Sequence, residues 1–393
     1  MPDVTFARLP TTIFEEMSGL ARATGAINLG QGFPDDPGPE VLRRKAAEAV
    51  LSGYNQYPPM AGLPELRQAV ARHYARTQGL DLDPTSEVTI TSGATEALAA
   101  TFLGLIEPGD EVIVFQPVYD AYLPLIRRAG GVPRLLTLSP PDWRFTREML
   151  AAAITPRTRF VVLNNPVNPT GVVVPEADLA LLAELCVAHD LIAVCDEVWE
   201  QVVFAPAVHR PLMAFPGMRE RCVKIGSAGK MFGLTGWKVG FLCAAPALSR
   251  VLARAHQFLT FTTPPNLQAA VAFGLEDPGD WFEAMPRNLA ASQARLAEAL
   301  RREGFGVLPS QGTYFLHVDL AASGVRMSDR DFALLAVRDA GVASIPVSAL
   351  YERDPVTSIL RLCFAKADET LDQGASRLAR ARDLAVQRAG RSI

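Results

Sequence analysis

Short runs of apolar, β-branched residues alternate along the chain with longer amphipathic stretches. The runs lie at 88–91, 111–115, 159–163, 191–195 and 222–225. Continuous apolar strands that alternate with helices predict a mainly parallel sheet with helices on both faces. A further run at 240–245 follows too closely for a helical crossover, so we expect it to run against the other strands. The pattern predicts an α/β fold.

The pattern changes after about residue 280. A long helical stretch reaches residue 302, and it is followed by a strand-like run at 313–319, a second helical stretch from about 329 and an apolar run at 360–365. These elements predict a smaller α+β domain beside the sheet. Near the other end of the chain, residues 30–39 are rich in glycine and proline and have little regular pattern. We therefore expect residues 1–45 to join the small domain, 46–280 to form the large domain and 281–393 to form most of the small one.

Several residues with chemically useful side chains follow directly after the predicted strands. In a sheet of this type, ligands bind beyond the carboxyl ends of the strands. The positions that follow successive strands are Gly93, Tyr119, Asn168, Asp196 and Lys230. We expect all five to meet in one crevice.

Lysine is scarce, because only five of the 38 basic residues are lysine. Unlike arginine, a desolvated lysine can lose its proton and attack a carbonyl. Lys230 and Lys238 lie in the glycine-rich stretch G-S-A-G-K-M-F-G-L-T-G-W-K-V-G, which begins just before Ser227. This stretch offers an amine nucleophile, a hydroxyl and a second cation close to a ligand, although solvated lysines at loop ends are the alternative.

Four other motifs each have a functional and a structural interpretation. The segment S-G-A-T-E-A-L at 92–98 is an anion site at a helix start or a plain helix cap. Asn168 lies between prolines, and either its side-chain amide points at a ligand or it belongs to a structural Asn-Pro turn. Asp196 ends an apolar strand and either needs a cationic partner or caps a helix. Arg361 alternates with apolar residues and binds either a carboxylate or a structural acid.

The composition is that of an ordinary globular protein and favours work on small molecules. The 393 residues are 49% hydrophobic and 20% charged, with a formal net charge of −4, which gives no electrostatic case for nucleic acid or a membrane surface. The five cysteines are widely spaced and predict neither a disulfide framework nor a metal site. We see no export signal or membrane anchor, so we expect a cytoplasmic protein.

Taken together, the motifs resemble the pyridoxal-phosphate-dependent aminotransferases of fold type I, class I. The resemblance rests on I-N-L-G-Q-G-F-P-D, N-Q-Y, the glycine-rich lysine stretch and L-R-L-C-F-A-K, and it runs from about residue 8 to residue 380. The motifs are most similar to those of the kynurenine, glutamine and methionine aminotransferases. Bacterial succinyldiaminopimelate aminotransferases share nearly the same set. The resemblance implies pyridoxal 5′-phosphate as cofactor and a homodimer with shared active sites.

The resemblance also implies roles for individual residues. Lys230 would bond to the cofactor aldehyde and later move a proton, and Asp196 would keep the ring nitrogen protonated. Other cofactor contacts are implied for Ala94, Thr95, Tyr119, Asn168, Trp199, Ser227, Lys238 and, in the neighbouring subunit's site, Tyr57. Substrate contacts are implied for Gly32, Asn168 and Arg361, which would hold the α-carboxylate, and for Phe14 and Phe261, which line the side-chain pocket unless they pack in the core or the dimer interface. Trp199 departs from the family pattern, which has tyrosine there.

The resemblance predicts a transaminase that moves the amino group of a neutral L-amino acid, aromatic, thioether or glutamine-like, to a 2-oxo acid by a ping-pong mechanism. One alternative is N-succinyldiaminopimelate as the donor, with the same chemistry. A second is a carbon–sulfur β-lyase acting on cysteine conjugates. A non-catalytic regulator is the third, but it would need a DNA-binding domain for which the chain has no spare length.

Overall fold

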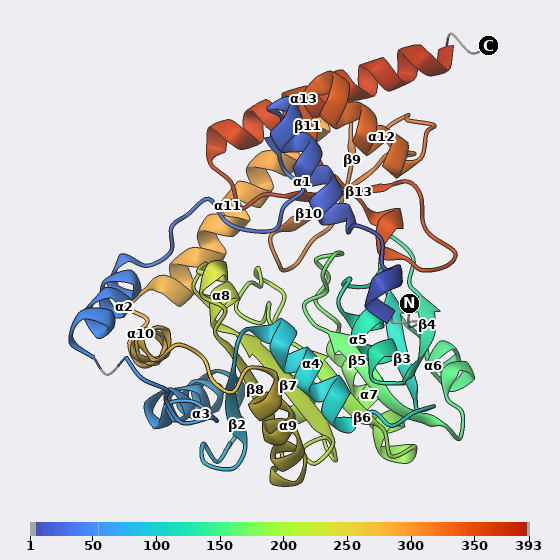
Figure 1. The fold of residues 1–393 in the computed structure, drawn as a ribbon. Coiled ribbons are helices and arrows are strands. Elements are labelled where there is room, and N and C mark those ends of the chain that lie inside the picture. The colour runs from blue at the N-terminus through green and yellow to red at the C-terminus, as the bar shows by residue number, and fades with distance from the viewer. Residues whose placement is uncertain (1–4, 54, 391–393) are drawn as a thin grey trace.

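A seven-stranded sheet forms the centre of the larger part of the molecule (Figure 1). The computed structural model describes residues 5–53 and 55–390. The strand order is β2-β8-β7-β6-β5-β3-β4, and β8 is antiparallel to both of its neighbours whereas the other pairs are parallel. The bounds are β2 Val88–Thr91, β3 Glu111–Gln116, β4 Val132–Thr137, β5 Thr158–Asn164, β6 Ile192–Asp196, β7 Cys222–Ser227 and β8 Gly240–Ala244. The predicted α/β fold and the reversed strand at 240–245 are confirmed.

Strand β4 was not predicted from the sequence. It lies at the edge of the sheet, contains Pro133 and, among the described strands, pairs with β3 alone. Its side chains are half-buried at most positions, so the apolar pattern that marks the central strands is weak here. Proline is tolerated at a sheet edge because one side of the strand makes no ladder hydrogen bonds.

Both faces of the large sheet are buried. Val112 and Val114 pack into one apolar cluster, and Ile113 between them packs into the other. This alternation explains why the central strands are apolar at nearly every position. The helices of this part are α2 Glu40–Ser52, α3 Pro64–Gln78, α4 Ala94–Leu105, α5 Tyr122–Arg128, α6 Arg147–Ala153, α7 Glu176–Ala188, α8 Ala228–Met231, α9 Pro246–Leu259 and α10 Pro265–Glu276.

The smaller part contains an antiparallel sheet of order β12-β13-β10-β9. A parallel pair joins β1 near the start of the chain to β11 near its end, so both chain ends contribute to this part (Figure 1). The bounds are α1 Ile13–Thr24, β1 Ile27–Asn28, α11 Trp281–Arg302, β9 Gly306–Leu308, β10 Phe315–Asp319, α12 Asp329–Leu335, β11 Val342–Ala343, β12 Ile345–Pro346, β13 Ile359–Cys363 and α13 Asp368–Gly390. The short helical turns are η1 Thr5–Arg8, η2 Leu212–Ala214, η3 Thr235–Trp237, the π-helical η4 Ala336–Ala340 and η5 Val347–Leu350.

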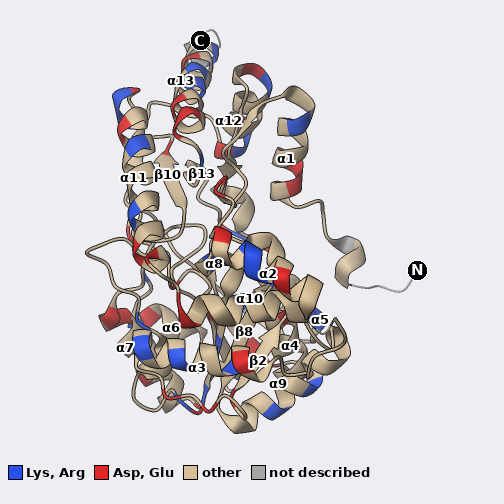
Figure 2. Cartoon of the chain, turned by 90° about the vertical axis from the view of Figure 1, so that its left-hand side faces the viewer, with Lys and Arg blue, Asp and Glu red and all other residues tan. Residues whose placement is uncertain are grey.

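Acidic and basic positions are interspersed along the outer helices, as α2, α11 and α13 show in Figure 2. The same view places the smaller part, with α12 and α13, at one end of the large sheet. Among the described residues, no helix is both long enough and apolar enough to cross a bilayer. The five cysteines are all buried and free. The exact domain boundaries near residues 45 and 280 stay a prediction.

Candidate active site

A cavity of about 180 Å³ lies at the carboxyl ends of the central strands. We call it the strand-end cavity. The five positions predicted to converge all line it. Its full lining is Gly93, Ala94, Thr95, Leu98, Tyr119, Tyr122, Asn164, Asn168, Asp196, Val198, Trp199, Ser227, Lys230, Thr235 and Lys238. Nine of the ten residues predicted to contact a cofactor are therefore together, and Tyr57 is the exception.

One end of the strand-end cavity is built to hold an anion. Helix α4 starts at Ala94, immediately after Gly93, so its first backbone amides have no partners within the helix. Gly93 has a φ of 79°, and a Cβ added there would lie 3.2 Å from the Lys238 Nζ. A Cβ on Gly240 would lie 2.9 Å from the Ala94 nitrogen. Because Gly93 and Gly240 have no side chains, the first amides of α4 and the Lys238 ammonium group can lie close together.

Asp196 also lines the strand-end cavity and is 4% exposed. Burial raises the pKa of this carboxyl to about 6, although a hydrogen bond from Tyr122 opposes the rise. The Tyr122 hydroxyl donates to Asp196 Oδ2 at 2.5 Å. Burial also raises the pKa of Tyr122 well above its usual value, so this phenol keeps its proton. The other oxygen, Oδ1, accepts a long hydrogen bond from the Val198 amide at 3.5 Å, and a cationic partner would stabilise this buried carboxylate further.

Lys230 lies on α8, directly after β7, and its amine is held by a tyrosine. Its Nζ donates to the Tyr314 hydroxyl at 2.9 Å and lies 4.5 Å from the centre of the Trp199 ring. Burial lowers the pKa of this amine to about 8. A substantial neutral fraction near neutral pH makes the amine a competent nucleophile. Lys224, by contrast, lies in a buried ion cluster with Glu197 and Glu200.

Arg361 extends from β13 into the junction between the two parts of the molecule and is 2% exposed. Its guanidinium donates to Asn168 Oδ1 at 3.0 Å and to the Gly30 carbonyl at 2.8 Å, and it packs 3.9 Å from the centre of the Phe315 ring. The buried Nε has no hydrogen-bond partner among the residues that the structure describes. A buried, unpaired guanidinium nitrogen is costly unless a ligand supplies the acceptor, and a carboxylate fits this fork.

The aromatic residues predicted around the substrate lie in different places. Phe14 packs against Arg361, with the guanidinium carbon 4.9 Å from its ring centre. Tyr57 and Phe261 contact each other edge to face, 80% and 40% exposed respectively, and line no part of the strand-end cavity. Gly32 lies beside Phe315, and a Cβ there would come within 2.6 Å of that ring.

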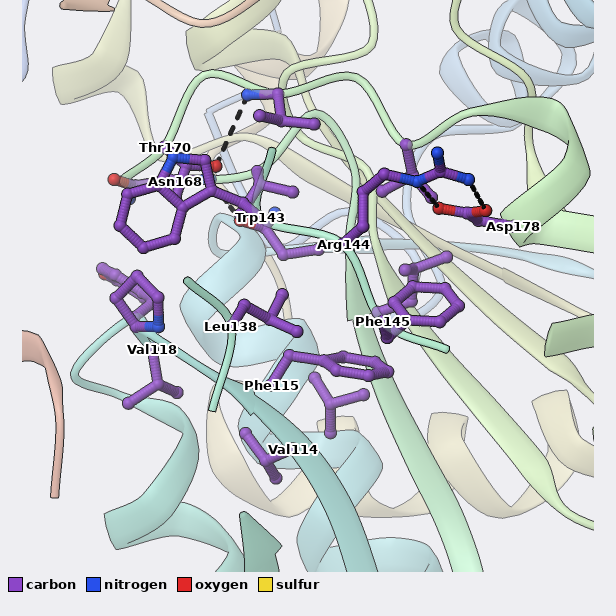
Figure 3. Close-up of a pocket in the computed structure, with 18 of the residues that line it drawn as sticks. Val114, Phe115, Val118, Leu138, Trp143, Arg144, Phe145, Asn168, Thr170 and Asp178 are labelled. Carbon is purple, nitrogen blue, oxygen red and sulfur yellow. Dashed lines mark hydrogen bonds and ion pairs between the residues drawn. The ribbon is translucent and has the colours of Figure 1, made fainter. Parts of the chain in front are cut away.

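The loop that carries Asn168 borders a small cavity of about 30 Å³ (Figure 3). Phe115 and Phe145 stack there with ring centres 4.8 Å apart, and Arg144 pairs with Asp178 at one side (Figure 3). Asn164 ties the loop to the neighbouring strand, because its side chain accepts from the Asn168 amide at 2.6 Å and donates to the Asp196 carbonyl at 2.8 Å. This support aims Asn168 toward the strand-end cavity.

Three residues of the site were missed in the sequence: Tyr122, Asn164 and Tyr314. Tyr122 follows Tyr119 by three positions, a spacing that brings both side chains to one side of a helical turn. Asn164 begins the motif around Asn168, and its location at a strand end was a usable signal. Tyr314 comes from a segment far along the chain, and nothing near it in sequence points to Lys230.

Comparison with known proteins identifies the family. The model of the family "Aminotransferase class I and II" matches residues 24–378. The chain belongs to this family. Like the family's other members, this aminotransferase depends on pyridoxal 5′-phosphate and has the fold of type I enzymes.

Named relatives cover nearly the whole aminotransferase. The probable N-succinyldiaminopimelate aminotransferase of Mycobacterium tuberculosis is 42% identical over 379 residues, 94% of this chain and 95% of that protein. The methionine aminotransferase of Escherichia coli is 41% identical over 380 residues, 96% and 98% of the two chains. The solved structure of the M. tuberculosis N-succinyldiaminopimelate aminotransferase superposes with a TM-score of 0.94 at 41% identity, covering 97% of this chain and 100% of that one.

The residues of the strand-end cavity fit the cofactor. The amides of α4 and the Lys238 ammonium suit its phosphate, the Lys230 amine suits its aldehyde, and the buried Asp196 suits its ring nitrogen. The donor set thus offers an anion site, an amine and a carboxylate in one cavity. Tyr119 also lines the cavity and presents an aromatic side chain for the ring.

Proposed function

We propose that this aminotransferase takes its amino group from a neutral L-amino acid, aromatic, thioether or glutamine-like, and passes it to a 2-oxo acid by a ping-pong mechanism. The observation that carries the proposal is that Lys230 and Asp196 line the same cavity. Arg361 is hydrogen-bonded to Asn168, which lines that cavity as well. The similarity to a methionine aminotransferase supports a neutral donor. The similarity to an N-succinyldiaminopimelate aminotransferase makes that longer, anionic donor the second candidate.

Each residue of the site has a proposed task. When bound, the cofactor supplies an electrophilic aldehyde and an electron-withdrawing ring. Lys230 would hold the cofactor through that aldehyde, and its Nζ, once free, would take the proton from the substrate α-carbon and hold it for return. Asp196 holds the proton on the ring nitrogen. The phosphate is held by the amides of Ala94 and Thr95, by Ser227 and by Lys238.

The remaining residues position the reactants. Asn168 has its Oδ1 engaged by Arg361, which leaves the amide Nδ2 to donate to the ring hydroxyl oxygen. Arg361 clamps the α-carboxylate of the substrate, helped by the Gly32 amide. Tyr119 covers one face of the ring. Phe14 shapes the space beside the clamp.

We also propose a homodimer with shared active sites, located in the cytoplasm. Tyr57 and Phe261 are both exposed and in contact, which leaves a joint aromatic surface for a second subunit. In this arrangement Tyr57 reaches the phosphate of the partner's cofactor. Five buried, free thiols suit a reducing compartment.

The half-reaction with single amino acids tests the substrate. Purified holoenzyme is mixed with methionine, phenylalanine, kynurenine, glutamine or N-succinyldiaminopimelate, without a 2-oxo acid, and the absorbance of the bound cofactor is followed. We expect at least one neutral donor to convert the bound cofactor quickly from its aldehyde form to its amine form. Conversion only by N-succinyldiaminopimelate would move the assignment to the second candidate. Release of pyruvate and ammonia from a cysteine conjugate would indicate the lyase instead.

Trp199 lies where the family commonly has tyrosine. We expect it to raise the pKa of the nitrogen that joins Lys230 to the bound cofactor. An indole cannot offer the O–H donor that stabilises a charged ring oxygen. Trp199→Tyr should therefore lower the midpoint of the absorbance titration of bound cofactor while activity is retained. Spectrophotometric titration of both proteins measures the two midpoints. Superimposable curves would contradict the expectation.

A further inference from the structure

Lys230 lies in the wall between the strand-end cavity and a second, larger cavity. This second cavity has a volume of about 370 Å³ and is lined by the start of α11, by residues 34–36 and 365–367, and by Tyr314. Lys230 is the residue that lines both cavities among those that the structure describes, so its side chain lies in the wall that separates them. A flexible side chain in that position needs a contact that fixes where the amine points.

The Tyr314 hydroxyl supplies such a contact, and its direction is fixed. A phenol has one proton to donate, and Tyr314 donates it to the Gly32 carbonyl at 2.6 Å. The same oxygen therefore accepts a hydrogen bond from the Lys230 Nζ, at 2.9 Å. Burial raises the pKa of Tyr314 well above its usual value, so it stays a neutral phenol over the working pH range.

The Tyr314 ring cannot easily move away. It is 2% exposed and packs edge to face on Trp199, with ring centres 4.5 Å apart, and against Phe315 at 5.1 Å. Gly32 approaches so closely that any Cβ there would meet the Phe315 ring. The phenol oxygen is therefore a rigid acceptor, placed by this packing together with its hydrogen bond to the Gly32 carbonyl.

We propose that Tyr314 is a positioning residue that aims the Lys230 amine at the strand-end cavity and ties it to the Gly32 segment. The proposal rests on the proposed function of Lys230. With one N–H directed at Tyr314, the reactive side of the amine faces the strand-end cavity instead of the second one. The same phenol joins Lys230 to the segment whose Gly32 amide is proposed to meet the substrate carboxylate. The substrate-binding and proton-transferring groups then share one rigid support.

An acceptor at this position also favours the protonated amine. The other groups that face Lys230 act in both directions, because Cys363 and Asp196 raise the pKa of the amine and Arg361 and Lys238 lower it. Burial dominates and brings the pKa to about 8. Loss of the Tyr314 oxygen removes an acceptor that stabilises the protonated amine more than the neutral amine, because an ammonium N–H is the stronger donor. The pKa of the amine should then fall further.

The first test titrates Lys230 in the enzyme stripped of cofactor. Acetylation of Lys230 by acetic anhydride is followed against pH by mass spectrometry in the wild type, in Tyr314→Phe and in the matched control Tyr351→Phe. Tyr351 donates to the Leu138 carbonyl at 3.1 Å and lines neither cavity. We expect the midpoint to move down by about one pH unit in Tyr314→Phe and to stay in place in Tyr351→Phe. Equal midpoints in all three proteins would overturn the proposal.

The second test measures the half-reaction in a stopped-flow instrument. We expect Tyr314→Phe to slow the single-turnover step on the order of 10–100-fold with little change in substrate affinity, because a misplaced amine costs rate rather than binding. Should Tyr314→Phe not fold, incorporation of 3-fluorotyrosine at 314 keeps the packing and weakens the acceptor, and the midpoint should shift in the same direction by less. A rate within twofold of wild type would refute a positioning role. An active Lys230→Ala enzyme would instead refute the proposed function.

Discussion

Replacement of Lys230 by alanine is expected to abolish turnover while the cofactor still binds. The anion site at the start of α4 and the Asp196 carboxylate do not depend on the lysine, so much of the binding energy remains. The amine that bonds to the aldehyde and moves the α-proton is lost, and a positioned acid–base group alone contributes about 10²–10⁴-fold. We expect kcat to fall by at least about 10⁴-fold, because the covalent step is lost as well.

Steady-state assays and cofactor binding, measured side by side, check this result. Lys230→Arg is the charge-matched variant, and it should be equally inactive because a guanidinium stays protonated. Lys45→Ala is the surface control, since Lys45 pairs with Glu48 on an exposed helix face. Lys230→Arg and Lys45→Ala should both keep the wild-type circular dichroism spectrum. Turnover near the wild-type rate in Lys230→Ala would contradict the proposed mechanism.

Replacement of Asp196 by asparagine is expected to weaken cofactor binding on the order of 10²–10³-fold, because breaking a buried charge pair costs about 3–5 kcal/mol. The effect should depend on pH. Burial raises the pKa of the Asp196 carboxyl to about 6 before the cofactor binds, so the carboxylate is the main form above that pH and the neutral acid is the main form below it. Wild-type affinity should therefore fall as the pH drops below about 6. Asp196→Asn should bind weakly at every pH.

Fluorescence titration with pyridoxal 5′-phosphate between pH 5 and pH 8 measures both curves. Asp372→Asn is a suitable control, because Asp372 pairs with Arg295 on the surface, away from the strand-end cavity. It should reproduce the wild-type curve. A pH-independent wild-type affinity, or an Asp196→Asn variant that binds normally, would show that the carboxylate does not face the ring nitrogen.

The sequence was sufficient for the central strands and for the residues at their ends. Most of the central strands carry a largely apolar signal, and the carboxyl ends of neighbouring parallel strands lie at the same edge of the sheet. The edge strand β4, with Pro133 and half-buried positions, lacks that signal. Helix α1 was missed as well, because only one face is apolar and its burial depends on residues from the far end of the chain.

The site could be predicted where a residue follows its own strand, and not where two distant segments meet. Lys230 and Asp196 fall in the first group. The contact between Lys230 and Tyr314 falls in the second, because it joins α8 to the turn just before β10. Tyr57 and Phe261 lie on the surface of the single subunit, so their predicted roles depend on a second copy and stay predictions.

The pairing of β1 with β11 affects how the protein is made. The ribosome releases the first strand early, whereas its partner at Val342–Ala343 emerges only after most of the chain has been synthesised. The large sheet can form during that interval from segments that are closer together in sequence. The opening segment must wait without its partner, with the apolar face of α1 uncovered. Nascent chains of this aminotransferase are therefore expected to need protection by chaperones until translation is almost complete.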